Sequence, residues 1–62
     1  MWKKASEFEI GQRVSHSSHG AGTVYAYDNS SDDDILVEFD VQPSGWDKIL
    51  CVTANNLVKL SS

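Results

Sequence analysis

Cysteine is nearly absent from this chain of 62 residues, which has one, Cys51. A single thiol cannot close an internal disulfide, and it excludes a zinc site built on several thiolates of one chain. An unpaired thiol is typical of a reducing compartment, so we expect a cytoplasmic protein. Without a covalent staple, a core this small is expected to give a stability of only a few kcal/mol.

Long apolar runs and basic residues are scarce as well. No run approaches the ~20 apolar residues that cross a bilayer, and the first residues show no signal-peptide pattern. Five Lys and Arg oppose nine Asp and Glu, and no base lies between Asp28 and Asp47. Because duplex-binding proteins neutralise several phosphates with basic side chains, this acidic middle disfavours a nucleic-acid partner.

Two of the four glycines, Gly20 and Gly22, stand directly before an alternating run at residues 23–27. Glycine adopts positive φ without steric cost and lets two backbones approach closely. The pair therefore predicts the first corner of a small barrel, where one strand turns sharply into the next. No helix pattern follows to supply an N-terminal dipole, so the pair does not predict a phosphate loop.

Apolar segments bounded by turn residues predict five short strands and one domain. The strands are expected near residues 12–17, 22–28, 35–40, 46–52 and 57–60, with a 3₁₀ turn at 53–56 before the last. This spacing predicts an all-β fold, a small five-stranded antiparallel barrel over residues 8–60. Residues 1–7 are expected to form a flexible N-terminal lead-in, after which Phe8 and Ile10 pack under the barrel.

Alternation within the strands assigns their faces. Val24 and Ala26 are predicted to point into the core, which places Tyr25 and Tyr27 side by side on the outer face. In the third strand the alternate residues of the wetter face are Leu36, Glu38 and Asp40.

Several short motifs together carry a resemblance that covers residues 8–60. They are Phe8-x-x-Gly11-x-x-Val14-x-His16, Gly20-x-Gly22-Thr23-Val24, Val37-x-Phe39-Asp40, Leu50, and Ala54-Asn55-Asn56-Leu57-x-Lys59-Leu60. This pattern resembles the small Tudor-like, SH3-like barrel at the C-terminal end of UvrD/PcrA-type DNA helicases. It is similar, more loosely, to the RNA-polymerase-interacting barrel of CarD-type transcription factors. The resemblance implies an SH3-like barrel that docks on a protein such as RNA polymerase and has no catalysis of its own.

The chain departs from that pattern in its charge, since the helicase modules tend to be basic in the region that is acidic here. The residues after His16 also lack the proline that is common there in the helicase modules. We expect a free-standing acidic module, and its size and charge point to a phage, a prophage or a mobile element.

An outer surface of aromatic and acidic residues is the predicted partner-binding site. Exposed apolar patches rimmed by polar residues often mark protein interfaces. The predicted partner-binding residues are Tyr25, Tyr27, Leu36, Trp46, Glu38 and Asp40. The acids on its rim favour a basic protein partner.

Other interpretations stay open at this point. A nucleic acid could bind through Arg13, Lys48 and Lys59, or the acids could mimic DNA. The aromatic residues could instead simply wrap the small barrel, or Trp2 could cover them. The edge strands could also pair in a homo-oligomer, because a small domain gains from burying an exposed edge.

Chemistry-bearing residues are few, and we expect neither enzymatic activity nor a cofactor. His16 and His19 offer two ligands where zinc takes three or four, so a third would have to come from an acid such as Asp28 or from Cys51. The acidic run at residues 32–34 lacks the pattern of a calcium loop. Cys51 is expected to be a half-buried structural thiol, and no metal is predicted.

Overall fold

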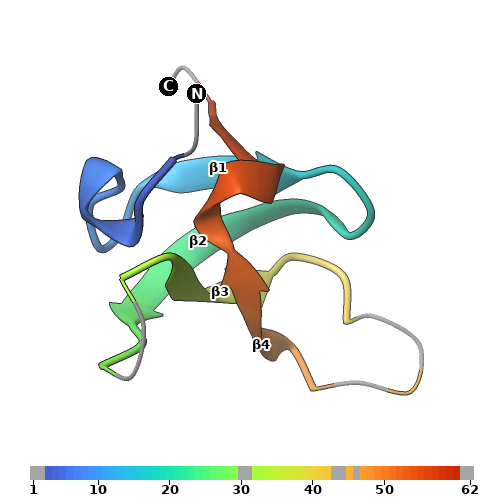
Figure 1. Ribbon diagram of the computed structural model, residues 1–62. Helices are drawn as coiled ribbons and strands as arrows, with labels where there is room; N and C mark the ends of the chain where they lie inside the picture. The colour runs from blue at the N-terminus through green and yellow to red at the C-terminus, as the bar shows by residue number, and fades with distance from the viewer. Residues whose placement is uncertain (1–2, 30–31, 43–44, 46, 61–62) are drawn as a thin grey trace.

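The computed structural model describes residues 3–29, 32–42, 45 and 47–60. They form a mostly β structure of five strands and two short 3₁₀ helices (Figure 1). The elements are η1 (Ala5–Glu7), β1 (Arg13–His16), β2 (Gly20–Tyr27), β3 (Asp34–Phe39), β4 (Ile49–Thr53), η2 (Ala54–Asn56) and β5 (Leu57–Lys59). Five strands and a 3₁₀ turn before the last one are confirmed, with bounds close to those predicted.

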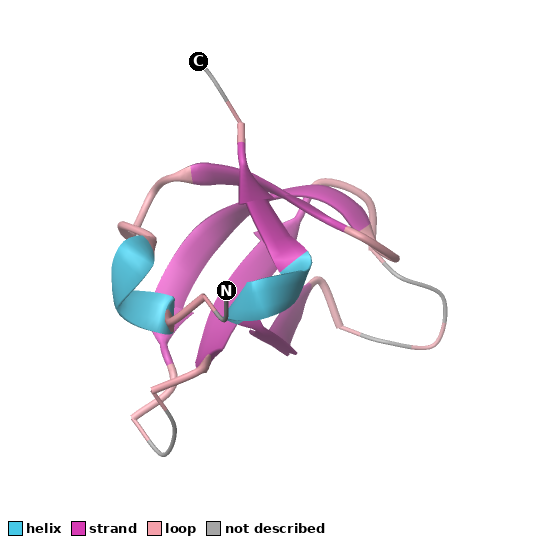
Figure 2. Ribbon diagram, turned by 45° about the horizontal axis from the view of Figure 1, so that its top comes forward, coloured by secondary structure: helices cyan, strands magenta, loops and turns pink. Residues whose placement is uncertain are grey.

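The strands form a single antiparallel sheet in the order β4-β3-β2-β1-β5. Consecutive strands β1 to β4 pair as a meander, and η2 returns the chain so that β5 pairs with β1. The sheet is strongly curved, with η1 and η2 beside it (Figure 2). The five-stranded antiparallel sheet is therefore confirmed. β4 and β5 are the two ends of its order, and among the described residues no strand pairing joins them.

One face of the curved sheet forms the core. Cross-strand partners share a face, and the facing residues Val24 and Val37 are both fully buried. The other members of the core cluster are Ala5, Phe8, Val14, Ile35, Phe39, Val52, Ala54 and Leu57. This inner set contains the apolar side of each strand, as alternation predicts.

The lead-in before β1 also contributes to the core. Phe8 is 1% exposed, as predicted, whereas Ile10 is 62% exposed, so its predicted packing under the sheet is wrong. The 3₁₀ turn η1 buries Ala5, whose N–H donates to the carbonyl of Asp32 at 2.9 Å. Lys3 Nζ donates to the carbonyl of Leu57 at 2.7 Å, which connects the first described residue to β5.

Both glycines of the predicted corner have a structural role. Gly20 has a φ of +82° at the start of β2, a value that favours glycine. Gly22 is buried between Val14 and Phe39, its partners on β1 and β3. An added Cβ there would lie 2.8 Å from the carbonyl oxygen of Glu38, so the inner side of β2 has no room for a side chain at this position.

A β-bulge interrupts β2 halfway along. Val24 lies opposite Val37, but Ala26 lies opposite Leu36, so Tyr25 is one extra residue relative to β3. Because side chains alternate with period two, an extra residue reverses the faces of everything that follows it. Ala26 therefore turns to the outer face, and the prediction that it points into the core is wrong.

Candidate functional site

The outer face of the sheet is read from the register of its strands. One row across it consists of Arg13, Thr23, Glu38 and Ile49, which pair in sequence across β1, β2, β3 and β4. Beyond the bulge a second row consists of Ala26, Leu36 and Cys51. We use the term outer face for these seven residues.

Two predicted site residues lie on this outer face. Glu38 is exposed and Leu36 is half-buried, and they occupy alternate positions of β3. Ile49 of β4 lies opposite Glu38 and is also half-buried, a contribution that the sequence interpretation missed. The face thus combines apolar side chains with an unburied carboxylate.

Asp40 follows β3 and is engaged by a base. The guanidinium of Arg13 donates from Nη1 to Asp40 Oδ1 at 2.8 Å and pairs through Nη2 with Oδ2 at 2.5 Å. Arg13 Nη1 also donates to Thr23 Oγ1 at 2.8 Å. The hydrogen bond from Arg13 holds the pKa of Asp40 below its ordinary value. Glu38, in contrast, lies opposite Thr23 and Ile49, and neither of these side chains is basic.

The two tyrosines do not lie side by side. Tyr25 is the extra residue of the bulge and is 54% exposed. Tyr27 lies opposite the buried Ile35, so it is on the inner side of the sheet, and its hydroxyl donates to the carbonyl of Phe8. The bulge is the reason, since alternation alone places both tyrosines on one face. Trp46, the remaining predicted site residue, lies outside the described residues.

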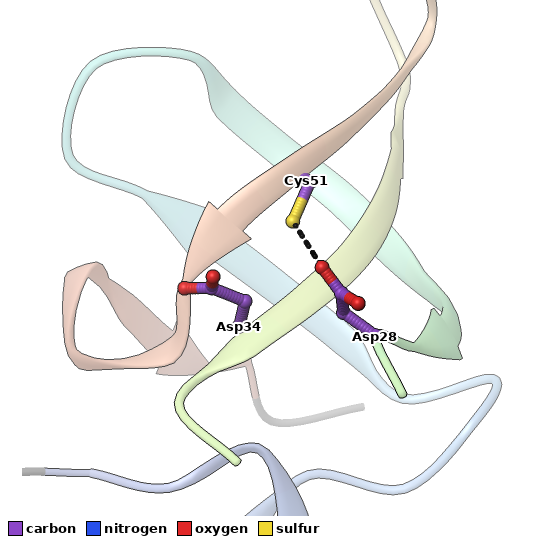
Figure 3. Close-up of side chains that lie close together, drawn as sticks. All are labelled: Asp28, Asp34 and Cys51. Atoms are coloured by element: carbon purple, nitrogen blue, oxygen red, sulfur yellow. Dashed lines mark hydrogen bonds between the residues drawn. The ribbon is translucent and has the colours of Figure 1, made fainter. Parts of the chain in front are cut away.

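A cluster of two carboxylates and a thiol lies at the far end of the outer face (Figure 3). Asp28 follows β2, Asp34 begins β3 and Cys51 lies in the middle of β4. One ligand atom from each of these side chains lies within 4.8 Å of the other two. Cys51 Sγ donates to Asp28 Oδ2 at 3.2 Å.

The surroundings of Cys51 suppress its ionisation. Partial desolvation, the hydrogen bond to Asp28 and the charges of Asp28 and Asp34 together raise the pKa of the Cys51 thiol to about 11. Cys51 is exposed, which corrects the expectation of a half-buried thiol. The sequence contained no signal for the cluster other than the three residue types, because their convergence depends on the bulge.

The two histidines lie near the opposite end of β2: His16 ends β1, and His19 is in the turn that precedes β2. His16 Nδ1 accepts the N–H groups of Ser18 at 2.9 Å and of His19 at 3.3 Å, so it caps the turn between β1 and β2. The rings of His16 and His19 have centroids 4.7 Å apart, and both lie against Phe39. Desolvation, followed by the charge of His19, lowers the pKa of His16. The histidines precede β2 whereas Asp28 follows it, and the metal-ligand group found among the described residues contains neither histidine.

Comparison of the chain with models of protein families, with curated proteins and with solved structures gave no match. Over the described residues, the chain forms no helix with the length and apolar character needed to span a membrane.

Proposed function

We propose that this chain is a non-enzymatic, cytoplasmic protein-interaction module with an SH3-like (Tudor-like) barrel. Its partner is a transcription or DNA-repair protein with a basic docking surface, and RNA polymerase is the first candidate. An origin in a phage or another mobile element belongs to the same proposal. The resemblance of the sequence motifs to helicase and CarD-type barrels supports the partner class.

The topology supports the barrel. A four-strand meander, a 3₁₀ turn and a last strand that returns to β1 give the order β4-β3-β2-β1-β5. The core lies within the curve of the sheet and includes Ala5 of η1, Ala54 of η2 and Phe8. Small barrels of this class use the outside of their strands and their loops for recognition, since their interior is filled by side chains.

The composition of the outer face is the observation that carries the proposal. Leu36 and Ile49 are half-buried there, and the exposed Tyr25 lies at the adjoining bulge. Glu38 is exposed on the same face, while Asp40 takes up the charge of Arg13. An apolar surface with an acidic margin is complementary to a partner that offers apolar side chains and a Lys or Arg.

Two of the three bases considered for a nucleic acid, Arg13 and Lys59, already make contacts within the chain. Arg13 is paired with Asp40, and Lys59 Nζ lies 5.8 Å from the centre of the Phe8 ring. Phosphate binding by these side chains would have to compete with those contacts, next to several carboxylates. No observation on the described residues favours a DNA mimic.

Direct binding to purified RNA polymerase tests the proposal. The protein is titrated against immobilised polymerase at low and moderate salt, with Leu36→Ser and Glu38→Lys as variants. Because interface anchors carry most of the binding energy, each variant is expected to weaken binding by at least about tenfold. Ile10→Ser is the matched control, since Ile10 is exposed and lies in the lead-in.

Circular dichroism of each variant verifies that the sheet is intact. Polymerase that does not bind, or that binds the two outer-face variants as tightly as the original chain, contradicts the proposed partner or surface. Tighter binding to duplex DNA than to polymerase at low salt contradicts the protein-docking function itself.

A further inference from the structure

A mixed group of oxygen and sulfur ligands converges at one end of the outer face. We propose that Asp28, Asp34 and Cys51 form a binding site for one divalent cation of the zinc class. Asp28 directly follows β2, Asp34 begins β3 and Cys51 lies in the middle of β4, and these strands are neighbours in the sheet (Figure 3). The two aspartates flank one hairpin, whereas Cys51 comes from a later strand, so the pairing of β3 with β4 brings the thiol to the carboxylates.

The bulge at Tyr25 places Asp28 in this group. Before the bulge, alternate residues of β2 point inward at Gly22 and Val24. Without the extra residue Asp28 would continue that inward series, whereas after it Asp28 follows the outward Ala26. Bulges re-aim side chains in this way and are frequent next to functional sites.

The hairpin between β2 and β3 brings the two carboxylates to one place. Tyr27 is paired with Ile35, and Asp28 and Asp34 are the next residues on the two arms of the hairpin. A cation between them takes one ligand from each carboxylate, and Cys51 supplies a third ligand from the adjoining strand.

The spacing of the donor atoms suits a small tetrahedral ion. With zinc bonds of about 2.0 Å to oxygen and about 2.3 Å to sulfur, neighbouring ligands are about 3.5 Å apart. Cys51 Sγ and Asp28 Oδ2 are 3.2 Å apart, and no pair of ligand atoms in the group is more than 4.8 Å apart. The aspartate side chains would have to rotate to bring all three ligand atoms to that spacing, and water would complete the fourth position.

The donor set selects the class of cation. Mg²⁺ and Ca²⁺ prefer sites made of oxygen, whereas a thiolate favours zinc and softer ions. On binding, the Cys51 thiol loses one proton to solvent and sulfur bonds to the metal, while the two carboxylates keep their charge. Leu36 lies opposite Cys51 and forms an apolar border to the site.

Calorimetric titration of the reduced, metal-free chain with Zn²⁺ tests the proposal, together with Cd²⁺ as a spectroscopic probe. We expect one ion per chain, and a new ultraviolet absorption from the bond between Cd²⁺ and the thiolate. Cys51→Ser should abolish that absorption, and both Cys51→Ser and Asp34→Asn should weaken Zn²⁺ binding by at least about tenfold. Asp47→Asn, which removes an exposed acid from the same acidic segment, should leave the affinity unchanged.

Four results would overturn the site. The first is the absence of Cd²⁺–thiolate absorption in the folded protein. The second is an equal loss of affinity in Asp34→Asn and Asp47→Asn, and the third is effective competition by Ca²⁺, because either means diffuse attraction to acids. The fourth is a ratio of one ion to two chains, which means that a second copy supplies ligands. Because Asp34→Asn leaves the thiol in place, it keeps the test decisive if Cys51→Ser does not fold.

Discussion

β2 is built differently on the two sides of the bulge at Tyr25. Before the bulge its inner positions are closed by packing, since Gly22 has no space for a side chain and Val24 is fully buried. After the bulge the inner residue is Tyr27, which is 40% exposed and donates a hydrogen bond to Phe8. We therefore expect the packed half to contribute more to stability, while the bulged half directs Ala26 and Asp28 outward.

The largest expected effect comes from filling the packed half. In Gly22→Val the new Cβ would lie 2.8 Å from both the Glu38 carbonyl oxygen and Val37 Cγ1. The carbonyl oxygen belongs to the backbone of β3, so it cannot move aside without disturbing the pairing of β2 with β3. Overpacking of this kind costs about 1–3 kcal/mol or more, which is comparable to the whole stability of so small a domain. We expect the variant to be largely unfolded at 25 °C by circular dichroism and urea titration.

The same residue placed beyond the bulge provides the control. Ala26→Val adds similar bulk to β2 but on the outer face, opposite Leu36. Its stability should stay within about 0.5 kcal/mol of the original chain. A Gly22→Val variant as stable as Ala26→Val would show that the inner side of β2 is not closed at that point.

The next effect concerns the thiol at the bulged end. A pKa of about 11 for Cys51 lowers the thiolate fraction near pH 8 by about a hundredfold relative to an ordinary thiol. The higher nucleophilicity of a more basic thiolate offsets about tenfold of that loss, so alkylation by iodoacetamide should be about tenfold slower than for a free thiol. Mass spectrometry with a chelator present measures the rate.

Asp28→Asn sharpens that measurement, since it removes a neighbouring charge and changes the hydrogen-bond acceptor. We expect faster alkylation in this variant, while Asp47→Asn serves as the unchanged reference. Equal rates in the original chain, in Asp28→Asn and in a short unstructured peptide would contradict the influence of the carboxylates on the thiol.

A smaller effect distinguishes the two tyrosines. Tyr27→Phe removes the hydroxyl that donates to Phe8, at a cost of about 1 kcal/mol in the free energy of unfolding. Tyr25→Phe, at the more exposed position, should change stability by less than about 0.5 kcal/mol. Urea titrations of the two variants compare these values directly. Equal losses would mean that the bulge does not separate the tyrosines as described.

That separation shows where sequence reasoning succeeds and where it stops. Alternation predicted the five strands and the burial of Val14, Val24, Val37 and Phe39, because burial of apolar side chains dominates strand pairing. The bulge is one extra residue of β2 relative to β3, and its position depends on the register of that pair, which the alternation of β2 alone does not contain. Tyr25 resembles any outward strand residue, so the reversal of Tyr27 and Asp28 could not be predicted.

In the candidate site, too, sequence reasoning succeeded within one strand and failed for contacts between strands. Leu36 and Glu38 lie on β3, which has no bulge within its own sequence, and their shared face followed from alternation. The pairing of Asp40 with Arg13 and the convergence of Asp28, Asp34 and Cys51 join residues from different strands. Such contacts depend on register, which the sequence fixes only through the complete fold.

The smallest expected effect is at the histidine end, where protonation opposes the turn. His16 Nδ1 accepts the N–H groups of Ser18 and His19, which it can do only while that nitrogen carries no proton. With a pKa lowered by desolvation and by His19, the folded chain binds this proton less readily than the unfolded chain. The stabilising contribution is therefore complete above the ordinary pKa of about 6.5 and is lost as the pH falls through the lowered value.

Urea titrations between pH 5 and pH 7.5 measure this loss, which should be smaller than that of Tyr27→Phe. In His16→Gln the slope of stability against pH should decrease, because the titrating acceptor of the turn is gone. His19→Gln should keep part of the slope, since the His16 acceptor remains and only the charge of its neighbour is removed. If His16→Gln keeps the full slope while His19→Gln abolishes it, His19 rather than the Nδ1 acceptor of His16 controls the pH response of this end of β2.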